Sequence, residues 1–511
     1  MKKVKQTLWL IAMVPLLYSQ LGCKKFLDRK PLGQAIDGDV SGGGAQSQVF
    51  GLYSSTRLWG MTGLAFLTLH GARADDNYNS TAGDGSDQQD IADNFNYTKD
   101  HWSLNSLWDD HYTFVTQANA IVHDVDSAYS SDPASIINEA EARFLRAYAY
   151  FDLVRDYGEV PILKDKILKP SDAIAAKSSV ADVYAFIDQD LQYAIGHLPT
   201  TWSSEYLGRV TVGAANALQA KTYLYRQQWA NALTSAELVI NSGLYSLDPS
   251  YSHLFSEAAE NGSESIFEIQ NYENANGSIG GDGSYSNGLP VYQAVRGAGD
   301  WNLGWGWNLP TETLVSGAYE ANDPRKGETI LESGQPDNVF GGITYGVSLP
   351  ASGTPYWNKK VYSDPARRAA TGDKGANWLN TRIYRYADVL LMAAEAANEL
   401  GNSSKALGYL EMVRARARDG QAGVLPEVTS TDQAVIRTAI KKERRVEFAM
   451  EFERFYDLVR WTPATDGIDA PTVLGPLGYT AKNKYYPIPQ EAIDKSELNG
   501  VKLLVQNPDY P

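Results

Sequence analysis

Two stretches of the chain combine aromatic side chains with arginine, aspartate and asparagine in segments that lack regular apolar spacing. A flat indole or phenol ring can stack on the C–H face of a sugar ring, while the polar side chains hydrogen-bond to its hydroxyl groups. We therefore predict a site for a sugar-like ligand, formed by Arg73, Asp75, Asp76, Asn79, Tyr97 and Trp102 in the first stretch and by Tyr285, Tyr292, Arg296, Trp301, Trp305 and Trp307 in the second.

The second stretch holds three tryptophans, Trp301, Trp305 and Trp307, in a segment interrupted by Gly304 and Gly306. Such a segment has no helical periodicity that could bury all three rings, so we expect at least one to face solvent. The alternative is that the rings only fix the loop to the rest of the protein. The tryptophans on or next to predicted helices are expected in the core: Trp229, Trp378 and Trp461.

Acidic residues raise two other possibilities, hydrolysis and metal binding. A glycosidase needs two carboxylates about 5–10 Å apart across a cleft, and adjacent aspartates such as Asp75 and Asp76 on a loop are common without catalysis. Calcium would accept oxygen ligands from residues 84–93, but the spacing differs from an EF-hand, and the six histidines form no HExxH motif. We predict no catalytic residue, no metal and no cofactor, with calcium as an unsupported alternative.

Composition limits the class of protein. The 511 residues include 45 Lys and Arg against 61 Asp and Glu, a net charge of −16 that works against binding nucleic acid. Hydrophobic residues make up 43% of the chain, which is ordinary for a globular protein. A single cysteine excludes an intrachain disulfide.

The first 23 residues have the pattern of an export signal. Three lysines precede an apolar run over residues 8–18, which is shorter than the roughly 20 residues that a membrane-spanning helix needs. Leu21 and Gly22 stand directly before Cys23, an order that resembles a bacterial lipoprotein signal. We predict a signal peptide over residues 1–22 and lipidation of Cys23, where two or more acyl chains would anchor the protein stably. The alternative is a buried cysteine after a plain secretory signal.

Apolar spacing near 3.6 predicts helices over residues 139–157, 179–197, 213–226, 229–241, 384–400, 403–418 and 432–452, and alternation predicts a strand over 265–269. Shifting the 213–241 pair by 174 residues places Ala220 on Ala394 and Ala232 on Ala406. Helix, short turn and helix with alanine at close approaches resembles the tetratricopeptide repeat. The predicted fold class is mainly α: about four helix pairs in a tetratricopeptide-like scaffold, with large loop insertions and a few short strands. Unrelated α-hairpins are the alternative.

We expect an N-terminal region over residues 23–243 and a C-terminal region over 244–511, packed as one body. The longest loop regions are predicted over 28–110 and 244–383. A charged cluster near the last helix, with Glu443, Arg444, Glu447, Asp457 and Arg460 among its members, is predicted to form ion pairs between neighbouring helices rather than a functional site.

Seven short motifs occur in one order along nearly the whole chain: Cys23-Lys24-Lys25-Phe26-Leu27-Asp28, Arg143-Phe144-Leu145-Arg146 with Tyr157-Gly158-Glu159-Val160-Pro161, Asp323-Pro324-Arg325, Tyr384-Arg385-Tyr386-Ala387-Asp388, Glu443-Arg444-Arg445, Pro487-Ile488-Pro489, and Gln506-Asn507-Pro508-Asp509-Tyr510. Together they resemble the SusD/RagB family, surface glycan-binding lipoproteins of Bacteroidota. Two positions depart from the family pattern, because Phe452 and Asp509 stand where glycine is usual.

The resemblance implies a lipoprotein of the outer membrane that faces the cell exterior and captures oligo- or polysaccharide without catalysis. It implies a partner, a SusC-like TonB-dependent transporter, against which the helices would pack while the loops hold the sugar. Two alternatives stay open: a tetratricopeptide-like scaffold for protein interactions, and a receptor for a non-sugar nutrient such as a peptide.

Overall fold

The structure is a computed structural model that describes residues 45–79, 91–271, 288–296, 303–341, 354–371 and 377–511. The predictions for Cys23, Tyr285, Trp301 and most of the 84–93 segment lie outside these residues.

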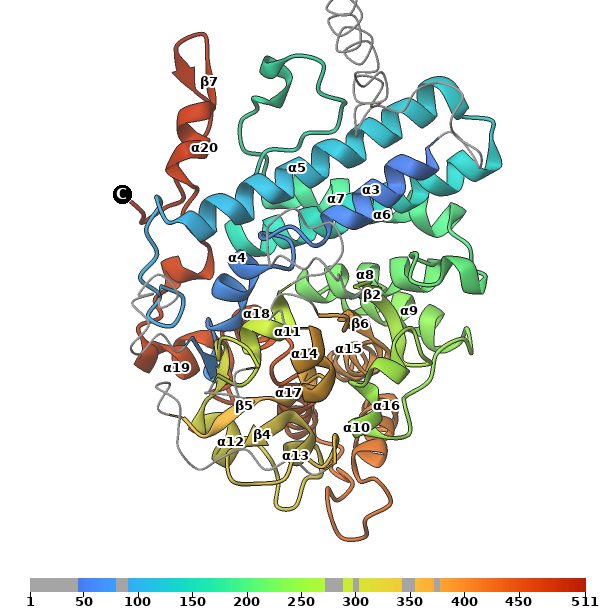
Figure 1. The fold of residues 1–511 in the computed structure, drawn as a ribbon, viewed down its shortest axis with the longest axis vertical. Helices are drawn as coiled ribbons and strands as arrows, with labels where there is room; N and C mark the ends of the chain where they lie inside the picture. The colour runs from blue at the N-terminus through green and yellow to red at the C-terminus, as the bar shows by residue number, and fades with distance from the viewer. Residues whose placement is uncertain (1–44, 80–90, 272–287, 297–302, 342–353, 372–376) are drawn as a thin grey trace, which may run out of the picture.

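Eight long helices form a continuous stack, in which each helix packs on the next (Figure 1). In order along the stack they are α5 (Trp102–Asp124), α6 (Pro133–Tyr157), α7 (Val180–His197), α8 (Val212–Tyr225), α9 (Trp229–Ile240), α15 (Tyr386–Glu399), α16 (Ser403–Ala417) and α17 (Gln433–Glu447). Helix α9 lies directly against α15 although the segment between them is long. The mainly α, tetratricopeptide-like prediction is confirmed.

Local sequence explains where these helices begin and how closely they approach. The carboxylate of Asp132 accepts a hydrogen bond from the Ser135 N–H at the start of α6, and Pro133 occupies its first turn. The helix ends at Gly158, whose φ of 74° is readily adopted by glycine. The alanines that the repeat comparison places together, Ala220 with Ala394 and Ala232 with Ala406, are all completely buried. Small side chains at these points let neighbouring helix backbones approach.

Two helix predictions need correction. Helix α5 was not predicted, because the segment before residue 110 was expected to be a loop. The last predicted helix ends earlier than residue 452, since α17 stops at Glu447 and the chain then turns through Met450 and Phe452, with φ values of 68° and 67°. These left-handed conformations cannot continue an α-helix. The aromatic segment that follows forms a separate short helix, α18 (Arg454–Arg460).

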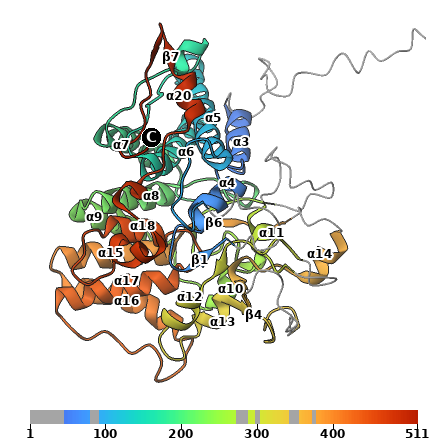
Figure 2. The same ribbon diagram turned by 90° about the vertical axis from the view of Figure 1, so that its left-hand side faces the viewer.

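The segment between α9 and α15 folds beside the stack (Figure 2). It consists of short elements: α10 (Tyr251–Leu254), β2 (Ser265–Ile269), α11 (Leu289–Gln293), β3 (Leu309–Pro310), α12 (Glu312–Gly317), α13 (Arg325–Thr329), β4 (Ile330–Glu332), β5 (Tyr356–Asn358), α14 (Pro365–Thr371) and β6 (Thr381–Arg385). The predicted strand over 265–269 is confirmed, and it pairs antiparallel with β6 at the far end of the segment. Strand β1 (Asn77–Tyr78) pairs with β3, which joins the two predicted loop regions.

The C-terminal segment returns along the stack. It contains α19 (Ala470–Leu474), α20 (Gln490–Lys495) and the hairpin of β7 (Glu497–Leu498) and β8 (Val501–Lys502), with α20 packed on α5.

A buried ion-pair network holds the segment between α9 and α15 against the helices. The Glu447 carboxylate, with no exposed surface, accepts hydrogen bonds from Arg416 at 2.5 Å, Arg385 at 3.1 Å and Arg325 at 3.2 Å. Burial by itself would raise the pKa of Glu447, but the three arginines outweigh it and lower the pKa to about 2. The predicted ion pairs of the last helix are confirmed, and they lie inside the protein: Arg444, for example, bonds both Asp457 and Asp388 at 2.8 Å.

Glu447→Gln should lower the free energy of unfolding by about 3–5 kcal/mol, since it leaves three buried guanidinium groups without their shared counterion. Because the pKa of Glu447 is held below its ordinary value of 4.5, its contribution should be present above that pH and lost as pH falls toward about 2. Urea unfolding of both proteins at several pH values measures this. Glu411→Gln, in a more exposed pair with Arg418, is the control and should cost less than about 1 kcal/mol. Equal losses in the two variants would contradict the assignment.

Asp509→Gly should raise the free energy of unfolding by up to about 1 kcal/mol, because Asp509 is held at a φ of 68° that glycine adopts without strain. Asp509→Ala keeps the Cβ and should give no such gain. Thermal unfolding of both variants measures the difference. A Gly variant no more stable than the Ala variant would show that this turn is not strained.

Candidate ligand-binding site

The loop that carries Trp305 is fixed to helix α11 by backbone hydrogen bonds. The N–H of Trp305 donates to the Val291 carbonyl at 3.0 Å, and the N–H of Trp307 donates to the Tyr292 carbonyl at 2.8 Å. Both acceptors lie in the last turn of α11 (Leu289–Gln293), where helix carbonyl groups are open to donors from outside the helix. Gly304 permits the contact, since a Cβ there would clash with the Val291 oxygen. The loop therefore has a defined conformation.

Three aromatic rings stack outward from the core at this loop. The Tyr292 and Trp307 ring centroids lie 5.7 Å apart at an interplanar angle of 25°, and those of Trp307 and Trp305 lie 5.6 Å apart at 23°. Exposure rises along the stack, from 3% for Tyr292 and 8% for Trp307 to 37% for Trp305. The expectation that one ring of this stretch faces solvent is met by Trp305, and its contact with a ligand stays a prediction.

A second exposed aromatic pair lies at the start of α5. Trp102 is half-buried, and its ring meets the edge of Trp59 with centroids 6.2 Å apart at 76°. Trp59 is 37% exposed. The Gly60 N–H donates to the Asp110 carboxylate at 2.7 Å, and a Cβ on Gly60 would clash with the backbone of α5. Glycine therefore allows the Trp59 loop to lie directly on the helix.

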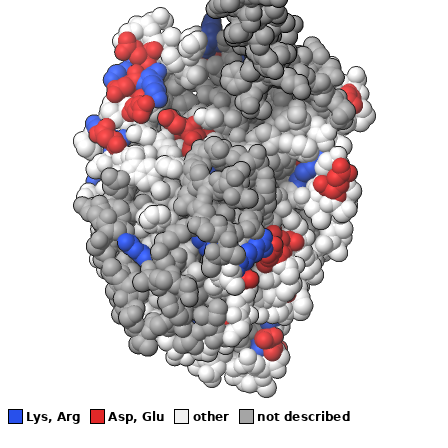
Figure 3. Space-filling model, in the orientation of Figure 1, with Lys and Arg blue, Asp and Glu red and all other residues white. Residues whose placement is uncertain are grey.

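Both groups of rings adjoin the short helix α4 (Leu64–Phe66). The Phe66 N–H donates to the Trp59 carbonyl at 3.0 Å, and the Phe66 side chain packs in one cluster with Tyr292 and Trp307. Trp59, Trp102 and Trp305, which come from three distant segments, are thus connected through packing on α4, and we call these three residues the aromatic surface. On the described part of the face seen in Figure 3, charged side chains stand in separate small groups with uncharged surface between them.

Sequence reasoning missed Trp59. The signal was present, because Leu58-Trp59-Gly60-Met61-Thr62-Gly63 is a tryptophan in a glycine-broken stretch, the same pattern that pointed to Trp305.

Arg73 is placed inside the protein rather than at a ligand site. It has no exposed surface, and its guanidinium lies 3.7 Å from the ring centroid of Phe455 and 3.9 Å from that of Tyr486. Its Nη1 pairs with Asp156 at 3.2 Å. A side chain enclosed in this way supports the fold, and we no longer assign it to the ligand.

Asp75 and Asp76 are also internally paired. Arg454 bonds Asp75 at 2.8 Å, and Arg445 bonds Asp76 at 2.6 Å. Burial disfavours the charge of Asp75, but Arg454 and Arg445 outweigh it and hold its pKa below the usual value. Burial and the adjacent charge of Asp75 raise the pKa of Asp76. The two carboxylates therefore tie the loop to α17 and α18.

The remaining predicted residues divide by exposure. Asn79 is buried, and its side-chain oxygen accepts the Asn308 N–H at 3.2 Å. Tyr97 is buried against Tyr486 with centroids 4.6 Å apart, and burial raises the pKa of Tyr97 to about 12. Arg296 is half-buried beside the Trp305 loop. Among the predicted residues that the structure describes, Trp305, Trp102 and Arg296 are partly exposed, and the others are buried.

The described residues contain no group of three His, Cys, Asp or Glu side chains placed to hold a metal ion. None of the helices described is both long enough and apolar enough to cross a membrane.

Comparison with known families decides the relationship. The profile described as "SusD family" matches residues 263–510, and the profile described as "Starch-binding associating with outer membrane" matches residues 66–224. The chain belongs to the SusD family. The resemblance that the seven motifs carried is confirmed, and it covers both regions of the chain.

Individual SusD relatives align over nearly the whole length. SusD-like protein P2 of Formosa agariphila is 28% identical, with 100% of each chain covered. A solved structure described as a laminarin-binding SusD-like protein is 28% identical, with 91% of this chain and 99% of that chain covered and a TM-score of 0.74. Surface glycan-binding protein A of Bacteroides thetaiotaomicron, solved in complex with laminarihexaose, is 25% identical over 90% of this chain and 98% of that chain, with a TM-score of 0.73.

Arg73→Leu should lower the free energy of unfolding by about 3–5 kcal/mol, because it leaves Asp156 buried without its guanidinium partner. Arg367→Leu is the control, since that arginine is 36% exposed and stacks on Trp378, and it should cost less than about 1 kcal/mol. Urea unfolding measures both. An Arg73 variant as stable as the parent would restore this residue as a candidate for the ligand site.

Proposed function

We propose that this SusD family member is a non-catalytic glycan receptor of the cell surface. It is anchored in the outer membrane through Cys23, faces the cell exterior, and delivers bound oligosaccharide to a SusC-like TonB-dependent transporter. The observation that carries the proposal is the exposed ring of Trp305 on its buried aromatic support, in a chain whose relatives include proteins described as laminarin- or glycan-binding.

The site suits a sugar because its rings are already ordered. Trp305 stacks on Trp307, and the loop beneath them is hydrogen-bonded to α11. A ring that is held in place before binding loses little rotamer freedom when a sugar stacks on it. The open surface offers contacts with few sugar units, so we expect dissociation constants between about 1 μM and 1 mM, or −8 to −4 kcal/mol.

The two aspartates that the sequence suggested for the site, Asp75 and Asp76, are paired in a way that favours binding without hydrolysis. The adjacent carboxylates of Asp75 and Asp76 are bonded to Arg454 and Arg445 and are nearly enclosed. A glycosidase would need one carboxylate free to donate a proton and a second across the scissile bond. These two side chains are engaged in holding the loop.

Laminarin is the first glycan to test, because two solved relatives are described with laminarin or laminarihexaose. Trp305→Ala should weaken laminarihexaose binding by roughly tenfold to a hundredfold, which corresponds to about 1.4–2.7 kcal/mol. The melting temperature should stay nearly unchanged, since the removed ring is partly exposed. Isothermal titration of residues 24–511 measures the affinity, and Leu238→Ala, an exposed apolar residue on α9, is the matched control.

Equal affinity of the Trp305 variant and the parent would remove Trp305 from the site. Failure of the parent to bind any member of an array of plant, host and microbial glycans would favour the peptide-receptor or scaffold alternative. Release of reducing ends from laminarin over time would contradict the non-catalytic assignment.

A further inference from the structure

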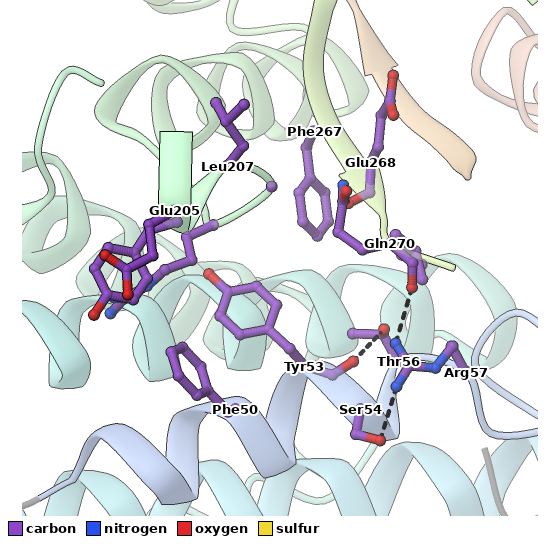
Figure 4. Close-up of a pocket in the computed structure, with 14 residues that line it drawn as sticks. Phe50, Tyr53, Ser54, Thr56, Arg57, Glu205, Leu207, Phe267, Glu268 and Gln270 are labelled. Atoms are coloured by element: carbon purple, nitrogen blue, oxygen red, sulfur yellow. Dashed lines mark hydrogen bonds between the residues drawn. The ribbon is translucent and has the colours of Figure 1, made fainter. Parts of the chain in front are cut away.

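A pocket of about 250 Å³ opens between helix α3 (Gln46–Ser55), residues 205–209 and strand β2. Figure 4 shows the rings of Phe50, Tyr53 and Phe267 around it, with Gln270 and Arg57 closing one side. We call it the Phe50 pocket, and define it by Phe50, Tyr53, Glu205, Tyr206, Leu207 and Phe267.

Hydrogen bonds to Glu141 and Val210 fix the inner wall of the Phe50 pocket. The Tyr53 hydroxyl donates to the Glu141 carboxylate at 2.7 Å and accepts the Val210 N–H at 2.9 Å. The Arg209 Nε also donates to Glu141 at 2.9 Å, and its guanidinium lies 3.8 Å from the Trp202 ring centroid. The charge of Arg209 is thus matched by a carboxylate with no exposed surface. The wall is preformed and electrically neutral.

The mouth of the Phe50 pocket exposes apolar and polar groups, and the Arg209 guanidinium lies 5.3 Å from the Phe50 ring centroid and 5.2 Å from that of Tyr206. Phe50 is 42% exposed and Leu207 is 55% exposed, and the rings of Phe50 and Tyr206 lie 6.4 Å apart. Among the described residues, neither the Glu205 carboxylate nor the Tyr206 hydroxyl has a hydrogen-bond partner. Rings beside free hydroxyl and carboxylate groups are the combination that a neutral sugar needs, and the exposed carboxylate disfavours an anionic ligand.

The Phe50 pocket adjoins the aromatic surface along the chain. Arg57 lines the pocket, donating to the Gln270 carbonyl and to the Ser54 hydroxyl, both at 2.9 Å. Trp59 follows two residues later, which is at most about 7 Å along the backbone. A glycan that stacks on Trp59 therefore has the pocket within reach of its next units.

We propose that the Phe50 pocket is a second sugar subsite, which takes further units of a neutral glycan chain bound at the aromatic surface. Phe50 and Tyr206 contact the C–H faces of the sugar, and the Glu205 carboxylate accepts hydrogen bonds from its hydroxyl groups. The proposal rests on the proposed function and extends it to longer ligands.

A peptide strand is a poorer occupant of the Phe50 pocket. Strand β2 pairs only with β6 in the described residues, so one of its edges could in principle receive another strand. The Gln270 side chain fills the space beside Gly208, so closely that a Cβ on Gly208 would clash with it. Its amide donates to the Glu268 carbonyl at 3.1 Å, so this strand carbonyl already has a hydrogen-bond donor.

Oligosaccharides of different length distinguish the two subsites experimentally. The double variant Phe50→Ala/Tyr206→Ala should lose roughly tenfold in affinity for laminarihexaose, or about 1.4 kcal/mol, while laminaritriose affinity is unchanged. Glu205→Gln, a gentler change at an exposed side chain, should weaken hexaose binding in the same direction by a smaller factor. Trp305→Ala should weaken both sugars, and Leu238→Ala neither. Isothermal titration measures all of these, with melting temperatures as the check on folding.

The outcomes are distinguishable. If the parent binds both sugars and the double variant binds laminarihexaose equally well, the second subsite is wrong and the proposed function stands. Equal losses for laminaritriose and laminarihexaose would place Phe50 and Tyr206 in the primary site and overturn the idea of a separate subsite. If the parent binds neither sugar, nor any glycan of the array, the proposed function fails and this inference fails with it.

Discussion

The burial of Glu447 among three arginines is the constraint on which the architecture depends. The arginines come from α13, from the end of β6 and from α16, while Glu447 ends α17. A carboxylate without exposed surface is tolerated only when its charge is matched, so these elements must meet at one point. The β2–β6 pair and the ion pairs of Glu447 together hold the segment between α9 and α15 against the helices. Because this segment lies beside the stack, α9 packs directly on α15.

Ion pairs also support the surface where we place the ligand. Arg445 and Arg454 hold Asp75 and Asp76, so the N-terminal loop is tied to the end of the helical stack. Strand β1 in that loop pairs with β3, and β3 follows directly after the Trp305 loop. The exposed rings are thus mounted on connections that lead back to the core. Asp75 and Asp76, which resembled ligand contacts in the sequence, form these connections.

The helices were predictable because apolar periodicity is local. Helix α5 carried the same signal, with Leu104, Leu107, His111, Phe114 and Ala118 buried at helical spacing, but the glycine- and aspartate-rich composition around it suggested a loop. For the site, the sequence indicated which types of side chain to expect but not which of them are exposed. Arg73 and Asp156 are 83 positions apart, and no spacing rule indicates that a loop arginine will be enclosed by Phe455 and Tyr486. Exposure of Trp305 followed from its glycines, and the same reasoning applied to Trp59 would have found it.

We expect a sugar to lie flat on an exposed tryptophan while the protein beneath it stays unchanged. A crystal structure of residues 24–511 soaked with laminarihexaose, or with a glycan selected from the array, tests this most directly. We expect density for a sugar ring stacked on Trp305, with Arg73, Asp75 and Asp76 still in their internal pairs. A bound sugar that instead contacts Arg73 or Asp76 after those pairs have opened, with Trp305 left bare, would contradict the account.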